Sequence, residues 1–133
     1  MTTDSLQRKL LVEDDTEIQT IARFALEKVG GFTVEACSSG AEAIERGPGF
    51  APQIILLDVM MPDMDGPSTH AELRRLPATA ETPVAFMTAK VQPQELARYY
   101  KLGAIDVISK PFDPMALADT VRAVWDKAHA DKE

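Results

Sequence analysis

The most restrictive feature of this sequence is a run of four aliphatic residues that ends in one carboxylate, Ile54-Ile55-Leu56-Leu57-Asp58. The residues that follow, 61–66, include a proline and a glycine, which end regular structure. An unbroken aliphatic run bounded in this way is typical of a strand buried on both faces, as in a parallel sheet. Asp58 would then lie at the carboxyl end of the strand, where open α/β sheets bind their ligands.

Size and charge limit the class of protein. The 133 residues suffice for one domain with a hydrophobic core, and we expect a single domain with no output domain, preceded by a loose extension over residues 1–7. The net charge of −7 argues against nucleic acid as a direct ligand. The sequence has no run long enough for a membrane helix and no secretory signal pattern. Its single cysteine, Cys37, is expected to be a small buried hydrophobe, which suits a cytoplasmic protein.

Hydrophobic periodicity predicts five alternating strands and helices. The expected strands cover residues 9–12, 32–36, 53–57, 83–87 and 105–108, with 32–36 as a half-exposed edge. The expected helices cover residues 16–29, 39–46, 67–76, 93–102 and 114–129. Thr16 with Gln19 is predicted to form a capping box, and Gly47-Pro48-Gly49 to end the second helix. This alternation predicts an α/β fold with an open, doubly wound, five-stranded parallel sheet, because a closed barrel needs far more chain.

Four of the five expected strands end in residues of marked chemistry. The first ends in Glu13 and Asp14, the third in Asp58, the fourth in Thr88 and the fifth in Lys110. Because all carboxyl ends of a parallel sheet lie at one edge, these side chains are expected to meet in one crevice.

Such a cluster suits phosphoryl chemistry. Two carboxylates 4 Å apart repel by about 4 kcal/mol at an effective dielectric constant near 20. A divalent cation would relieve this repulsion, and oxygen ligands without histidine or cysteine favour Mg²⁺. Lys110 and Thr88 can hold phosphoryl oxygens, which leaves Asp58 as the nucleophile.

The segments that carry these residues resemble the receiver domain of two-component response regulators. The resemblance covers nearly the whole chain and rests on four segments in the expected order: Leu11-Val12-Glu13-Asp14-Asp15, residues 57–66, Met87-Thr88-Ala89 and Lys110-Pro111-Phe112. It implies a flavodoxin-like (βα)5 fold with strand order 2-1-3-4-5. It also implies that the chain is not an enzyme acting on a separate substrate.

The resemblance assigns a role to each acidic residue. Asp58 would be the phosphoacceptor, and Asp14 a direct ligand of Mg²⁺. Glu13 would bind the metal through water, and the backbone carbonyl of Met60 would complete the protein's share. Counting back five residues from Ile18, an apolar residue of the expected first helix, reaches Glu13. This selects Glu13 and Asp14 as the acidic pair and leaves Asp15 outside.

The resemblance also implies the remaining contacts and partners. Thr88 and Lys110 would contact the phosphoryl group, and the Lys110–Pro111 peptide would be cis. A histidine kinase or phosphotransfer protein would be the donor. A protein partner would read a face formed by the fourth helix, fifth strand and fifth helix of a stand-alone receiver, as a monomer or phosphorylation-linked dimer. One position departs from the family: Val107 replaces the usual aromatic residue, so the switch pair would be Thr88 and Val107.

Other interpretations remain open from sequence alone. Val107 supports a phosphorylation-independent adaptor with the same fold. A phosphohydrolase of the haloacid dehalogenase type would need a second aspartate at the position of Met60, and an FMN-binding flavodoxin would need a phosphate-cradling first loop. Asp63 and Asp65 are expected to be loop charges, and His70 and His129 to be exposed.

Overall fold

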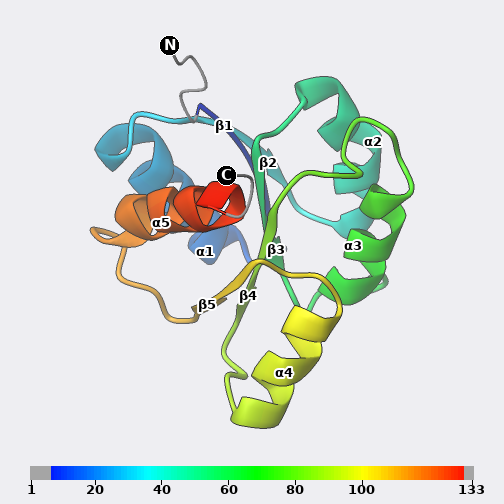
Figure 1. The fold of residues 1–133 in the computed structure, drawn as a ribbon. Coiled ribbons are helices and arrows are strands. Elements are labelled where there is room, and N and C mark those ends of the chain that lie inside the picture. The colour runs from blue at the N-terminus through cyan, green and yellow to red at the C-terminus, as the bar shows by residue number, and fades with distance from the viewer. Residues whose placement is uncertain (1–6, 131–133) are drawn as a thin grey trace.

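The computed structural model describes residues 7–130, which form one central sheet between two layers of helices (Figure 1). The predicted N-terminal extension lies outside the described residues except for Gln7. The backbone N–H of Gln7 donates to the side-chain oxygen of Gln53 at 2.7 Å, so this residue already belongs to the edge of the fold.

Five parallel strands form the sheet in the order β2-β1-β3-β4-β5. The strands are β1 (Arg8–Val12), β2 (Thr33–Cys37), β3 (Ile54–Asp58), β4 (Val84–Thr88) and β5 (Asp106–Ser109). The predicted fold class and strand order are therefore confirmed, and β2 is an edge strand as expected. All five residues of β3 are buried, because the strand is paired on both sides and covered on both faces.

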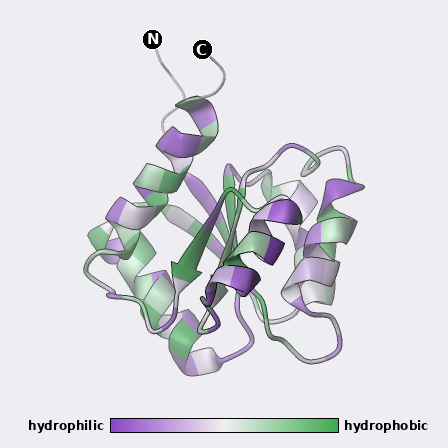
Figure 2. Cartoon of the chain, turned by 60° about the horizontal axis from the view of Figure 1, so that its bottom comes forward, coloured by the Kyte–Doolittle hydropathy of each residue, from purple (hydrophilic) through white to green (hydrophobic). Residues whose placement is uncertain are grey.

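Helices cover both faces of the sheet. They are α1 (Thr16–Phe24), the short π-helix η1 (Ala25–Val29), α2 (Gly40–Phe50), α3 (Gly66–Arg74), α4 (Pro93–Lys101) and α5 (Leu117–Ala130). α1 and α5 lie on one face, and α2, α3 and α4 lie on the other (Figure 1). Side chains alternate along β3, so Leu56 joins the core under α1 and α5 while Leu57 joins the core under the other helices. Figure 2 shows the resulting pattern, with apolar central strands and helices of mixed polarity around them.

The second helix is longer than the sequence predicted. Pro48 lies inside α2, which continues to Phe50 instead of ending near residue 46. A proline in the last turn of a helix removes only one backbone hydrogen bond, and Gly47 lets the helix approach Leu10 of β1 closely. The helix ends instead at Ala51, whose φ of 53° lies in the left-handed region.

Two helix caps also differ from the prediction. Asp15, not Thr16, caps α1, and its carboxylate accepts a hydrogen bond from the N–H of Glu17 at 2.9 Å. Asp65, expected to be a loop charge, caps α3 by accepting from the N–H of Ser68 at 2.8 Å. A carboxylate can serve either role, and only the path of the backbone decides which amide it reaches.

His70 is buried, contrary to its predicted exposure. Its Nε2 accepts a hydrogen bond from Nε of Arg74 at 3.0 Å, and its ring packs edge-to-face on Phe86 with 5.6 Å between the centroids. Burial, and secondarily the charge of Arg74, lowers the pKa of His70 to about 4. His70 is therefore a neutral packing residue near pH 7. The prediction for Cys37 is confirmed, because its side chain is fully buried.

Candidate functional site

A lysine from the end of β5 joins two carboxylates from other strands at the carboxyl edge of the sheet. Nζ of Lys110 lies 2.9 Å from a carboxylate oxygen of Glu13 and 2.9 Å from one of Asp58. Both carboxylates are almost fully buried, with Asp58 3% and Glu13 1% exposed. The structure thus brings together residues that lie 52 and 97 positions apart in sequence.

Asp14 completes an acidic cluster. One carboxylate oxygen from each of Glu13, Asp14 and Asp58 lies within 4.8 Å of the others. Asp15 is turned away from this cluster, since its carboxylate caps α1. The acidic pair selected from the sequence therefore lies where it was expected.

Burial dominates the electrostatics of Asp58. Burial, together with the nearby charge of Glu13, raises the pKa of Asp58 to about 7, although the hydrogen bond from Lys110 opposes this shift. The pKa of Lys110 is raised, because its hydrogen bonds to Glu13 and Asp58 outweigh the opposing effect of burial. The cluster therefore gathers three carboxyl groups around one lysine.

This donor set fits a hard divalent cation. The three carboxylates supply only oxygen ligands, and a second positive charge would stabilise the ionised form of Asp58. Met60, which follows Asp58 by two residues, is 60% exposed in the adjoining loop, and the role of its backbone carbonyl stays a prediction. The Lys110–Pro111 peptide is cis, as expected.

Thr88 lies beside Lys110 at the same edge. The backbone N–H of Lys110 donates to the carbonyl oxygen of Thr88 at 2.9 Å, and the Thr88 side chain is buried. Its hydroxyl oxygen accepts a hydrogen bond from the backbone N–H of Lys90 at 3.0 Å. Val107 packs against the apolar core under α2, α3 and α4. The structure thus ties the Thr88 hydroxyl to the loop that leads into α4.

Sequence reasoning missed one supporting residue, Gln19. Its side-chain nitrogen donates to the backbone oxygen of Glu13 at 2.9 Å and to that of Cys37 at 3.2 Å. This side chain joins the loops that follow β1 and β2, and so fixes the backbone beside Glu13. A glutamine in the first turn of a helix resembles a capping residue in sequence, so no local signal identifies this role.

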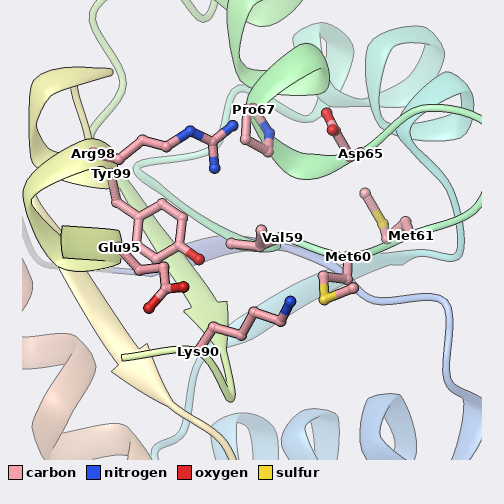
Figure 3. A pocket seen from close by; sticks show the side chains of 9 residues that line it. All are labelled: Val59, Met60, Met61, Asp65, Pro67, Lys90, Glu95, Arg98 and Tyr99. Atoms are coloured by element: carbon pink, nitrogen blue, oxygen red, sulfur yellow. The ribbon is translucent and has the colours of Figure 1, made fainter. Parts of the chain in front are cut away.

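A pocket of about 530 Å³ adjoins the loop that follows Asp58 (Figure 3). Val59 and Met60 from the loop after β3 form one wall, and Lys90 lies across from them. Tyr99 and Arg98 of α4 form another wall. The pocket therefore separates the loop after β3 from α4.

Comparison with known sequences decides the family. A profile described as "Response regulator receiver domain" matches residues 10–122. This chain belongs to the response regulator receiver family. The match includes all the clustered residues of this receiver, from Glu13 to Lys110.

Similar proteins are transcriptional response regulators. The receiver is 34% identical over 120 residues to the alkaline phosphatase synthesis transcriptional regulatory protein PhoP of Bacillus subtilis, covering 90% of this chain and 49% of PhoP. It is 36% identical over 115 residues to the transcriptional regulatory protein CseB of Streptomyces coelicolor, covering 86% of this chain and 47% of CseB. The chain thus spans about half the length of these relatives.

Solved receiver structures share the fold. The chemotaxis protein CheY4 of Vibrio cholerae superimposes with a TM-score of 0.83 at 27% identity, over 90% of this chain and 99% of CheY4. A response regulator from Chloroflexus aurantiacus gives a TM-score of 0.81 at 26% identity, over 91% of this chain and 98% of the other. Within residues 7–130 of the receiver, none of the helices combines the length and apolar character of a membrane span.

Cation binding should stabilise the receiver measurably. Millimolar Mg²⁺ is expected to raise the free energy of unfolding by about 1–3 kcal/mol, because only the folded state gathers the three carboxylates. Asp14→Ala should abolish this gain, whereas Asp126→Ala, at an exposed position on α5, should retain it. Urea unfolding with and without Mg²⁺ measures the difference. An equal gain in both variants would contradict a cation site at the cluster.

Proposed function

We propose that this receiver accepts a phosphoryl group from a phosphohistidine donor onto Asp58, with Mg²⁺ as cofactor, and thereby switches a partner-binding face. The observation that carries the proposal is the convergence of Asp58, Glu13, Asp14 and Lys110 at one edge of the sheet. The donor would be a histidine kinase or a phosphotransfer protein, as the family implies.

In this proposal each side chain has a task that the geometry supports. A carboxylate oxygen of Asp58 forms a bond to phosphorus while the bond from phosphorus to the donor's imidazole nitrogen breaks, and the electron pair stays on that nitrogen. Lys110 already lies 2.9 Å from Asp58, so its ammonium group can contact a phosphoryl oxygen with little movement. The hydroxyl of Thr88 donates to a second phosphoryl oxygen. Asp14 and Asp58 would hold Mg²⁺ directly and Glu13 would hold it through water, and the ion would supply positive charge to stabilise the transferring group.

The output surface would be the face formed by α4, β5 and α5. Tyr100 of α4 is 42% exposed, and its hydroxyl donates to the Asp106 carboxylate of β5 at 3.2 Å. Nζ of Lys127 on α5 lies 5.4 Å from the centroid of the Tyr100 ring. One exposed aromatic residue therefore links all three elements, and a change in α4 would alter the surface that a protein partner meets.

The test uses a small-molecule phosphodonor, so that no cognate kinase is needed. Incubation with acetyl phosphate and Mg²⁺ is expected to add one phosphoryl group to the wild-type chain, as measured by intact mass. Asp58→Asn should stay unmodified. The matched control is Asp63→Asn in the exposed loop that follows Asp58, where φ is 69° and asparagine is well tolerated, and it should be phosphorylated like the wild type.

Each outcome separates the proposed function from its rivals. No mass change in the wild type would refute phosphoryl acceptance and leave the adaptor interpretation. Phosphorylation of Asp58→Asn would place the acceptor elsewhere. Repeated turnover of a phosphate ester by the wild type would favour a phosphohydrolase. Chelation of divalent cations should prevent phosphorylation of the wild type if the acidic cluster holds the cofactor.

A further inference from the structure

Position 107, where the resemblance implies an aromatic switch residue, is occupied by a valine. Val107 is partly buried against apolar neighbours, and its side chain has no hydrogen-bonding atom. A valine side chain has few accessible χ1 rotamers, so a change at Asp58 is not expected to move it to a new rotamer. Coupling between the acceptor and α4 therefore has to use other side chains.

Tyr99 is the aromatic residue of α4 that faces the acceptor loop. Its side chain is only 1% exposed, and its ring extends from α4 into the pocket toward Val59 (Figure 3). Val59 follows the acceptor Asp58 directly in sequence. Tyr100, the next residue on the helix, faces outward instead, so the two tyrosines serve different surfaces.

Two routes lead from Thr88 toward Tyr99. Phe86 lies two residues before Thr88 on β4, so the two side chains point to the same face of the sheet. The Phe86 ring packs edge-to-face on Tyr99, with 5.6 Å between centroids and an interplanar angle of 84°. The second route runs through the loop, since the Thr88 hydroxyl accepts a hydrogen bond from the backbone N–H of Lys90, and Lys90 lines the same pocket as Tyr99.

The first turn of α4 lacks a side-chain cap and lies beside a pocket. Its N-cap residue, Gln92, makes no side-chain capping hydrogen bond. Oε1 of Glu95, in the first turn, is buried and has no hydrogen-bond partner among the described residues. The pocket beside this turn has a volume of about 530 Å³. A small pull on the preceding loop can therefore shift this end of the helix.

From these contacts we propose that Tyr99 is the positioning residue that couples phosphorylation of Asp58 to α4, in place of an aromatic residue at position 107. This inference rests on the proposed function. When the Thr88 hydroxyl turns toward the phosphoryl group, the loop carrying Lys90 follows it. The pocket then narrows against the Tyr99 ring, and the first turn of α4 becomes more ordered.

The experiment measures amide hydrogen exchange in α4 with and without acetyl phosphate and Mg²⁺, alongside the mass of each sample. Coupling between sites typically amounts to about 5- to 150-fold, so phosphorylation should slow exchange in α4 of the wild type by at least about fivefold. Tyr99→Met should be phosphorylated normally but lose this slowing to less than about twofold. Tyr99→Phe keeps the ring and should respond like the wild type. Tyr100→Met and Val107→Ala should also keep the response.

The outcomes distinguish this inference from the proposed function. A wild type that gains no mass refutes the proposed function itself. Phosphorylated Tyr99→Met with the full response of the wild type would overturn the role of Tyr99. If Tyr99→Met does not fold, loss of the response in Tyr99→Phe or in Val107→Ala would overturn the proposal, because either result assigns the coupling to a group other than the ring.

Discussion

Gly66→Ala is expected to destabilise the protein by roughly 3 kcal/mol and to slow phosphorylation about a hundredfold. A Cβ atom on Gly66 would lie 2.4 Å from the backbone oxygen of Asp58 and 2.8 Å from Cα of Val59. Both neighbours are backbone atoms, so they cannot rotate aside as the end of a long side chain can. Relief of the overlap has to displace either the start of α3 or the acceptor residue.

Urea unfolding measures the loss of stability, and intact mass after timed exposure to acetyl phosphate measures the loss of rate. The control is Gly49→Ala in α2, where an added Cβ meets nothing within 4 Å. Alanine favours helix over glycine by up to about 1 kcal/mol, so this control should be neutral or slightly stabilising. If the two variants had the same free energy of unfolding and the same rate of phosphorylation, the loop after Asp58 would be able to shift without a loss of stability.

Lys9→Met is expected to raise the free energy of unfolding at pH 7 by about 2 kcal/mol. Lys9 is fully buried in β1, and its Nζ has no hydrogen-bond partner in the described part of the chain. Nζ lies 3.7 Å from the centroid of the Phe32 ring, which is a cation–π contact. Burial, and secondarily the charges of Arg122 and Arg8, lowers the pKa of Lys9 to about 7.

The gain from Lys9→Met should depend on pH. The pKa of Lys9 is about 7 in the folded state, against 10.5 for a lysine in the unfolded chain, so below pH 7 both states are protonated and the cost of burying the charge is complete. Between pH 7 and 10.5 the unfolded state binds more protons, so the wild type gains stability as pH rises. The advantage of Lys9→Met should therefore shrink toward about pH 10.

Urea unfolding of both proteins at about pH 6, 8 and 10 tests this expectation, since the cost falls only across the window set by the two pKa values. Lys101→Met, at an exposed position on α4, is the control and should change stability by less than about 0.5 kcal/mol at every pH. An advantage for Lys9→Met that stays constant with pH would mean that Lys9 is charged in the folded protein throughout.

The site was predictable from sequence to the extent that it depends on topology. Apolar runs at 54–57 and 84–87 indicate buried parallel strands, and all parallel strands present their carboxyl ends at one edge. The meeting of Asp58, Glu13 and Lys110 follows from that rule, and the structure bears it out. Local signals failed where a residue had more than one possible partner, as with Asp15, Asp65 and Gln19.

The order of residues along the chain was enough to predict the five strand–helix units, the parallel sheet and the edge at which the acidic residues gather, because hydrophobic periodicity and strand ends can be read along the chain. The contacts between helices and the sheet could be learned only from the folded protein. The burial of His70 and Lys9 and the contact of Tyr99 with Phe86 depend on how helices and strands pack across the sheet. Such contacts join residues with no fixed spacing, so no pattern along the chain records them.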